Sequence, residues 1–176
     1  MKKVVLLVTT VACLALLQSV FAGLGETQGS SYSGSKEFER IKNLAGIWEG
    51  TSNMGKEAQK VRVEYRSTAG GSAMVETLFP GTPEEMISVY YDREGRLVMT
   101  HYCMLQNQPH MRLDRSALDR LDFLFSEGGN IDPAKDSHMH ALTLSFPDKN
   151  RLIQKWTFFE DGKEKGVTVL TLTRIE

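Results

Sequence analysis

The chain is poor in cysteine, with two in 176 residues, Cys13 and Cys103. Cys13 lies in an apolar run near the N-terminus that we expect to be removed, which leaves Cys103 alone. A lone cysteine excludes an internal disulfide, so the exported protein must depend on its hydrophobic core for stability. We expect Cys103 to be a small buried residue, with a role as a soft ligand as the alternative.

A marked excess of either charge is also missing. The chain has 21 basic and 22 acidic residues, and removal of Lys2 and Lys3 with the leader lowers the net charge from −1 to −3. No basic stripe is present, which argues against nucleic acid as a partner. The chain also lacks a Gly-x-Ser-x-Gly elbow, a phosphate-binding loop and the two-histidine helix of metalloproteases, so enzymatic activity is the less favoured interpretation.

The first 22 residues have the pattern of a secretory signal peptide. Two lysines precede an apolar run over 4–17, and a small-x-small cleavage site ends at Ala22. A membrane anchor is the alternative, but the run is shorter than the ~20 residues that a span requires. We therefore expect an exported protein, periplasmic or extracellular, that does not span a membrane after processing. Residues 23–35 are expected to form a flexible leader and residues 36–176 the folded domain.

The domain begins with a short helix and continues with strands. Phe38 and Ile41 recur at helical spacing, with Ser35 as the expected cap. In QKVRVEYR, by contrast, charged and apolar residues alternate, which predicts a strand with one buried face. Alternation of this kind predicts about ten strands, at 44–52, 59–66, 73–79, 86–91, 96–105, 110–115, 120–126, 138–146, 151–159 and 165–175. Their short connections favour an all-β, antiparallel up-and-down β-barrel whose helix plugs one end, with a sandwich as the second choice.

Two distant segments carry a family resemblance. Gly46-Ile47-Trp48 opens the first strand, and Arg174 ends the last one. The pattern resembles the calycins, which include lipocalins, fatty-acid-binding proteins and nitrobindin-like barrels, and an exported bacterial member of that group would fit. The resemblance implies that the Arg174 guanidinium lies over the Trp48 indole. The second lipocalin turn motif and the lipocalin disulfide are both missing, and ten strands fit better than eight.

The topology predicts where a ligand would enter. The longer connections fall at the barrel end away from the helix, where binding residues tend to gather. Because alternate residues of a strand share a face, His138 and His140 are expected to point into this mouth with Leu142. The same reasoning brings His101 and Cys103 there. With His110 in the nearby loop, all four histidines of the chain are expected near one opening.

The favoured function is binding of a small apolar or amphipathic molecule in the barrel cavity. If Glu76 points inward it needs a partner, for which Arg112 is the candidate. The residues expected to bind the ligand are His101, Tyr102, Asn107, Gln108, Arg112, His138, His140 and Glu76.

Three alternatives stay open. The first is a metal or haem protein, whose metal ligands would be His138, His140, His101 and Cys103. The second is an enzyme that uses Cys103 with His101, or a histidine beside Glu76 or Asp136. The third is an envelope protein that acts on partners and binds no ligand. The methionines of the strands favour flexible core filling over a copper site. Neither the ligand nor the oligomeric state follows from the sequence.

Overall fold

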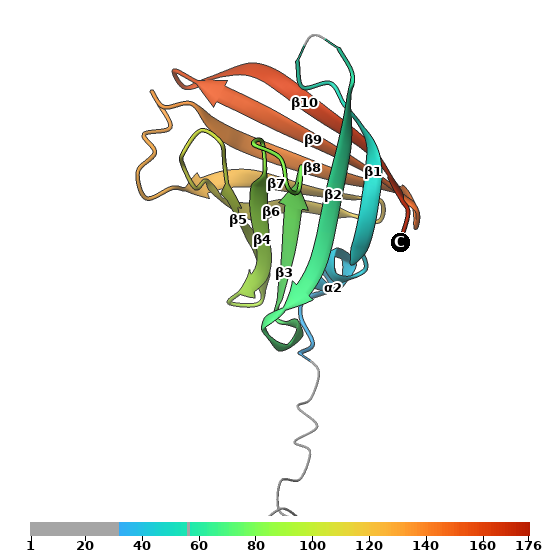
Figure 1. Ribbon diagram of the computed structural model, residues 1–176. Helices are drawn as coiled ribbons and strands as arrows, with labels where there is room; N and C mark the ends of the chain where they lie inside the picture. The colour runs from blue at the N-terminus through green and yellow to red at the C-terminus, as the bar shows by residue number, and fades with distance from the viewer. Residues whose placement is uncertain (1–31, 56) are drawn as a thin grey trace, which may run out of the picture. The chain divides into compact units, whose positions relative to one another are not determined.

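The computed structural model describes residues 32–55 and 57–176, which form a closed barrel of ten antiparallel strands with one short helix (Figure 1). The all-β fold class is confirmed. The predicted signal peptide, residues 1–22, and most of the predicted leader, residues 23–35, lie outside the described residues. The strands are β1 (Gly46–Ser52), β2 (Gln59–Thr68), β3 (Ala73–Leu78), β4 (Met86–Arg93), β5 (Arg96–Tyr102), β6 (His110–Ala117), β7 (Arg120–Glu127), β8 (His138–Asp148), β9 (Arg151–Glu160) and β10 (Lys163–Arg174).

Each strand pairs with its neighbours in sequence, and β1 pairs with β10 to close the barrel. In that closing pair the Cα partners run from Trp48 with Arg174 to Ser52 with Leu170. Figure 1 shows β2 to β5 upright and β8 to β10 running across them. Closure pairs each of the ten described strands on both sides, so the sheet has no open edge among them. Within the described residues no helix is long and apolar enough to cross a bilayer.

Side-chain alternation fills the interior. In β2 the apolar residues Val61, Val63 and Tyr65 are buried, and the charged residues between them face outward. Leu142 and Leu144 of β8 are buried as the sequence predicts. The largest buried side chains lie among aliphatic ones in a single core cluster and include Trp48, Tyr90, Phe38 and Phe123.

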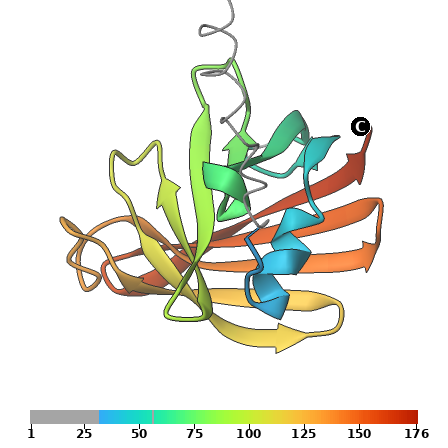
Figure 2. The same cartoon turned by 90° about the horizontal axis from the view of Figure 1, so that it is seen from below.

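The helix α2 (Lys36–Lys42) covers one end of the barrel, as Figure 2 shows from below. Ser35 caps it by accepting a hydrogen bond from the Phe38 amide at 3.1 Å, so the expected cap is confirmed. Phe38 and Ile41 are fully buried on the barrel core. The helix is short, and its stability therefore comes from this packing more than from its own hydrogen bonds.

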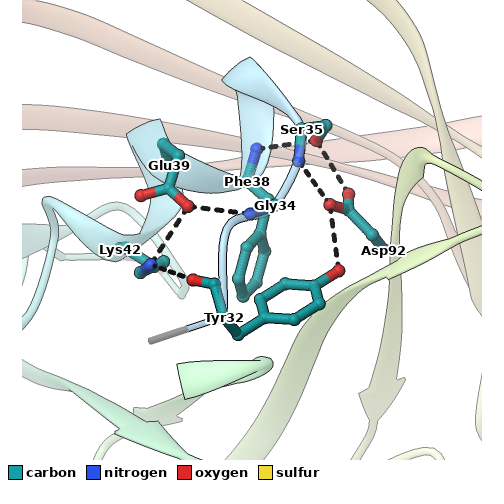
Figure 3. Close-up of polar contacts among 7 residues, drawn as sticks. All are labelled: Tyr32, Gly34, Ser35, Phe38, Glu39, Lys42 and Asp92. Atoms are coloured by element: carbon teal, nitrogen blue, oxygen red, sulfur yellow. Dashed lines mark hydrogen bonds and ion pairs between the residues drawn. The ribbon is translucent and has the colours of Figure 1, made fainter. Parts of the chain in front are cut away.

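The segment before the helix is attached to β4 through Asp92 (Figure 3). The Ser35 hydroxyl donates to Asp92 Oδ1 at 2.7 Å, and the Ser35 amide donates to Oδ2 at 2.5 Å. The Tyr32 hydroxyl reaches the same carboxylate at 3.5 Å, and the Gly34 amide donates to Glu39 at 3.0 Å. The end of the expected leader, residues 32–35, is therefore part of the folded domain.

Arg174 joins the helix to the barrel. Its guanidinium carbon lies 4.3 Å from the centre of the Trp48 ring, so the contact expected from the calycin resemblance is present. The same guanidinium donates to the carbonyls of Ala45 and Asn43, at 2.5 and 2.6 Å. Trp48 Nε1 donates to the Leu44 carbonyl at 2.8 Å. These bonds satisfy the carbonyls of the C-cap Asn43 and of Leu44 and Ala45 in the connection to β1.

Candidate functional site

A buried carboxylate, that of Glu76 in β3, lies at the centre of the interior. Alternation along β3 turns Met74, Glu76 and Leu78 into the core. The Tyr65 hydroxyl donates to Glu76 Oε1 at 2.6 Å, and the Tyr90 hydroxyl donates to Oε2 at 3.0 Å. A buried carboxylate without donors would be costly. The hydroxyls of Tyr65 and Tyr90 are therefore the partners that a buried Glu76 was expected to need.

The network continues in two directions from Glu76. Gln154 Nε2 donates to Glu76 at 2.5 Å, and Gln154 Oε1 accepts a 2.9 Å bond from Trp156 Nε1. On the other side the Ser88 hydroxyl opposes the rise in the pKa of Glu76, and Ser88 Oγ lies 3.0 Å from His101 Nδ1. Glu76, Ser88 and His101 are Cα partners across β3, β4 and β5. The network therefore links a carboxylate to an imidazole through one hydroxyl.

Burial controls the protonation of these groups. It raises the pKa of Glu76 above its ordinary 4.5, against the opposing effect of the hydrogen bonds that Glu76 receives. It lowers the pKa of His101 from 6.5 to about 4, so this imidazole is neutral near pH 7. Ser88 engages Nδ1 of His101, and Nε2 has no hydrogen-bond partner among the described residues.

A cavity of about 30 Å³ lies beside His101, and we call it the inner cavity. A single water needs roughly 10–15 Å³ of such volume, so the inner cavity has room for one or two waters or one ion. The sequence led us to expect a larger ligand chamber, but bulky side chains such as Tyr90 and Phe123 fill that space. The residues that line the inner cavity are Met54, Leu78, Phe79, Met86, His101, Met139, Trp156, Thr168 and Leu170.

A second hollow of about 390 Å³ adjoins the inner cavity at the barrel end away from α2, and we call it the rim pocket. The two share Met54, Met86, Met139 and Thr168 in their walls. The remaining wall residues of the rim pocket are Asn53, Gly55, Cys103, Met104, Leu105, Phe158, Gly166 and Val167. The wall is thus mainly apolar and rich in sulfur.

The histidine pair of β8 does not line either hollow. The β8–β9 pairing shifts register between Met139 and Ala141, and this bulge turns Met139 to the inner cavity. His138, fully buried, stands 3.0 Å from His140 between Nε2 and Nδ1. The His140 ring stacks on Phe159 at 3.9 Å between centres, and His138 Nδ1 lies 2.8 Å from the Asp136 carbonyl. One bulged residue changes which face of the strand each side chain occupies, and strict alternation cannot foresee it.

Two other sequence-predicted residues lie on the outer wall. Met111 faces the core, so the neighbouring Arg112 is exposed and makes no contact with Glu76. Tyr102 follows the buried His101 and is 51% exposed. The expected pairing of Glu76 with Arg112 is therefore wrong, because adjacent strand residues point to opposite faces.

The polar residues predicted in and beside the β5–β6 loop lie in different surroundings. Asn107 is buried and donates from Nδ2 to the Ser137 carbonyl at 2.8 Å, while its Oδ1 has no partner among the described residues. Gln108 is exposed. His110 lies beside Thr100, with 3.1 Å between Nδ1 and Oγ1, and borders an outer groove with Arg112. The four histidines therefore occupy three separate environments.

The expected metal set of His138, His140, His101 and Cys103 does not converge. Within residues 32–55 and 57–176 no group of three or more histidine, cysteine, aspartate or glutamate side chains is placed to hold a metal ion. A haem does not fit the inner cavity, which is far smaller than a porphyrin. Burial raises the pKa of the Cys103 thiol and lowers that of His101, the opposite of what a thiolate–imidazolium nucleophile requires.

A groove of about 530 Å³ beside α2 is lined by several basic residues, including Arg40 and Arg174. Both guanidiniums are already used within the protein. Arg40 donates to the carbonyls of Ala117 and Leu118, and Arg174 donates to carbonyls at the end of α2. We interpret this groove as structural.

Several residues of the site were not foreseen, namely Ser88, Tyr90, Gln154, Trp156, Met54 and Met86. A signal for Ser88 and Gln154 was present in the sequence. Each is a single polar residue on an apolar strand face, Ser88 between Met86 and Tyr90, and Gln154 between Leu152 and Trp156. A polar residue in that position predicts a buried hydrogen-bonded network.

No family model and no curated protein matches the chain. Among solved structures, a protein of unknown function of the DUF3598 family from Nostoc punctiforme is similar, with a TM-score of 0.50 and 11% identity. The match covers 77% of this chain and 49% of that protein, so the chain spans about half the length of its neighbour. A redesigned β-barrel matches over 77% of this chain and 95% of its own, at 14% identity and a TM-score of 0.35. The first likeness supports the barrel fold alone.

Proposed function

We propose that this barrel binds a small apolar or amphipathic molecule in the rim pocket. The observation that carries the proposal is an apolar pocket of about 390 Å³ at the barrel end left uncovered by α2. Pockets for small molecules commonly have volumes of about 300–1,000 Å³ and mostly apolar walls with a few polar groups. The ligand sits in the rim pocket and not deep in the barrel, because the interior beyond the inner cavity is filled.

The composition of the rim pocket suits an adaptable binding surface. Methionine side chains are unbranched and polarisable, so they adjust to ligands of different shape. Met104 and Leu105, in the turn after β5, are 51% and 40% exposed. Large apolar side chains left in water at the edge of an apolar pocket are typical of a binding site.

His101 supplies the polar contact for such a ligand. Its neutral ring lines the inner cavity, and its Nδ1 is engaged by Ser88. The Nε2 lone pair then accepts a hydrogen bond from a hydroxyl or amide that a ligand extends past Met86 and Met139. This contact favours ligands with one donor group at the end of an apolar body.

We also propose that the barrel has a calycin-like origin and that the protein is exported. The Gly46-x-Trp48 segment, the contact of Trp48 with Arg174 and the helix at one end support a calycin-like origin. The lysines and apolar run of residues 1–22 support export, which is tested by the mass of the protein recovered from the cell envelope. Cleavage after Ala22 gives a mature N-terminus at Gly23, and an uncleaved chain contradicts export by this route.

The two tryptophans allow a direct test of ligand binding. Trp156 lines the inner cavity, while Trp48 lies under Arg174 beside α2. We expect apolar ligands with a hydroxyl or amide end to change the fluorescence of Trp48→Phe protein, whose remaining indole is Trp156. The matched Trp156→Phe protein should respond little. An equal response of both variants, or no saturable response in a broad ligand panel, would contradict the proposal.

A further inference from the structure

The methionines of the described chain fall into groups with different surroundings. Three are fully buried among aliphatic and aromatic core residues, Met74, Met99 and Met111. Three others line the inner cavity together with His101, namely Met54, Met86 and Met139. The first group fits the core-filling role that the sequence favoured. The second group comes from three distant segments, the β1–β2 connection, β4 and β8, and it gathers around one small space.

We propose that the inner cavity binds one soft monovalent cation, Cu(I) or its analogue Ag(I), through one imidazole and up to three thioethers: His101, Met54, Met86 and Met139. Thioether and imidazole ligands select soft ions of this kind. No aspartate or glutamate lines the inner cavity, so its wall lacks the carboxylate ligands that typically bind Mg²⁺ and Ca²⁺, and Thr168 supplies the one side-chain hydroxyl. Its volume of about 30 Å³ suits one ion.

The orientation of His101 supports this assignment. Ser88 Oγ lies 3.0 Å from His101 Nδ1, and in the tautomer protonated at Nδ1 this ring nitrogen donates to Ser88. The lone pair of His101 is then on Nε2, which has no partner among the described residues. A histidine that binds a metal usually donates its other N–H to a fixed group, and Ser88 is such a group.

Trp156 completes the surroundings of the ion. Its ring centre lies 4.6 Å from that of His101, and its Nε1 is fixed by Gln154 at 2.9 Å. An indole face beside the ion attracts positive charge. Thioethers are uncharged, so the site would retain the full charge of the ion, which favours a monovalent ion over a divalent one in apolar surroundings.

This inference goes beyond apolar-ligand binding in the rim pocket, and the two can be separated. Leucine has nearly the volume of methionine but offers no sulfur, and swaps of this kind are well tolerated in cores. The double variant Met86→Leu/Met139→Leu should lose affinity for Ag(I), which is measured with no apolar ligand present and so does not depend on the rim-pocket proposal. The matched control is Met99→Leu/Met111→Leu, which changes two buried methionines away from the inner cavity.

The test is a titration of purified protein with silver nitrate in a Cys103→Ser background, since Cys103 lines the rim pocket and thiols bind silver by themselves. The readout is the NMR signal of ¹³C-labelled methionine methyl groups. We expect one equivalent of silver to shift Met54, Met86 and Met139 but not Met99 or Met111. Affinity should fall roughly tenfold or more in Met86→Leu/Met139→Leu and stay unchanged in the control pair.

Four results would overturn the inference. Three are no saturable binding, equal shifts at Met99 and Met111, and binding that the Met86→Leu/Met139→Leu variant retains in full. The fourth, read from a histidine-ring spectrum of the same sample, is a set of shifts confined to the His138 and His140 rings, because they would place silver at the β8 histidine pair. The methyl shifts are measured with every proposed ligand intact, so the test does not depend on whether the leucine variants fold.

Discussion

The imidazole of His101 lies 4.6 Å, between ring centres, from the indole of Trp156. This contact lies between the hydrogen-bonded core around Glu76 and the inner cavity. On one side His101 reaches Glu76 through Ser88, and on the other both rings line the inner cavity under the rim pocket. Protonation of His101 therefore places a positive charge next to both the Glu76 network and the inner cavity.

Stability should depend on the protonation of His101. Its pKa is about 4 in the folded protein, below the ordinary 6.5, so its contribution is complete above pH 6.5 and is lost as pH falls toward 4. The shift corresponds to a loss of about 3 kcal/mol. Urea unfolding at pH 7 and pH 4 should show this loss in the wild type and a much smaller one in His101→Phe. The control His110→Phe, on the outer wall, should keep most of the wild-type dependence.

The ionisation of Glu76 should change stability with pH in the opposite direction to that of His101. Burial raises its pKa above 4.5, so its contribution is complete below pH 4.5 and is lost as pH rises through the folded-state value. We expect Glu76→Gln to remove this loss, so that the stability of the variant relative to wild type increases with pH. The control Glu84→Gln, in an exposed loop, should follow the wild-type profile. A Glu76→Gln profile parallel to the wild type would show that Glu76 titrates normally.

Gly46 is required by the closure of the barrel. Its φ of +128° is one that other residues rarely adopt, and a Cβ there would overlap the Glu176 carbonyl oxygen. We expect Gly46→Ala to cost about 2–4 kcal/mol in unfolding free energy, from strain and from displacement of the chain end. Gly95→Ala has a positive φ but open space around it, and should cost about 1 kcal/mol. Equal losses would mean that the contact with Glu176 is unimportant.

Arg174 should contribute more to stability than an exposed ion pair. Arg174→Ala removes two hydrogen bonds to carbonyls at the end of α2 and the contact with Trp48. We expect a loss of about 2–3 kcal/mol in urea unfolding and a changed Trp48 emission. Arg151→Ala breaks only a surface pair with Asp148 and should cost less than about 1 kcal/mol. A neutral effect of Arg174→Ala would contradict the role given to it.

The sequence predicts the architecture well because the barrel is built from local regularities. Alternation as in β2 and the helical spacing of Phe38 and Ile41 gave strands and a helix that the structure contains. The candidate site was harder to predict because it depends on departures from regularity. The bulge between Met139 and Ala141 exchanges the histidines for a methionine at the inner cavity.

Hydrogen-bond partners that come from distant strands could not be predicted from the sequence either. Glu76 was expected to need a partner, yet its donors are Tyr65, Tyr90 and Gln154, which only the closed barrel brings together. The volume of the interior was also unpredictable, because it depends on how the rings of the core interlock and not on residue type.

The central claim is that small apolar molecules bind above His101 among the methionines of the rim pocket. The most direct test is a set of intermolecular NOEs between a bound ligand and labelled methionine methyl groups. The account predicts NOEs to Met54, Met86, Met104 and Met139, and none to Met74, Met99 or Met111. A ligand that binds with NOEs elsewhere, or only to the ring protons of His138 and His140, would contradict it.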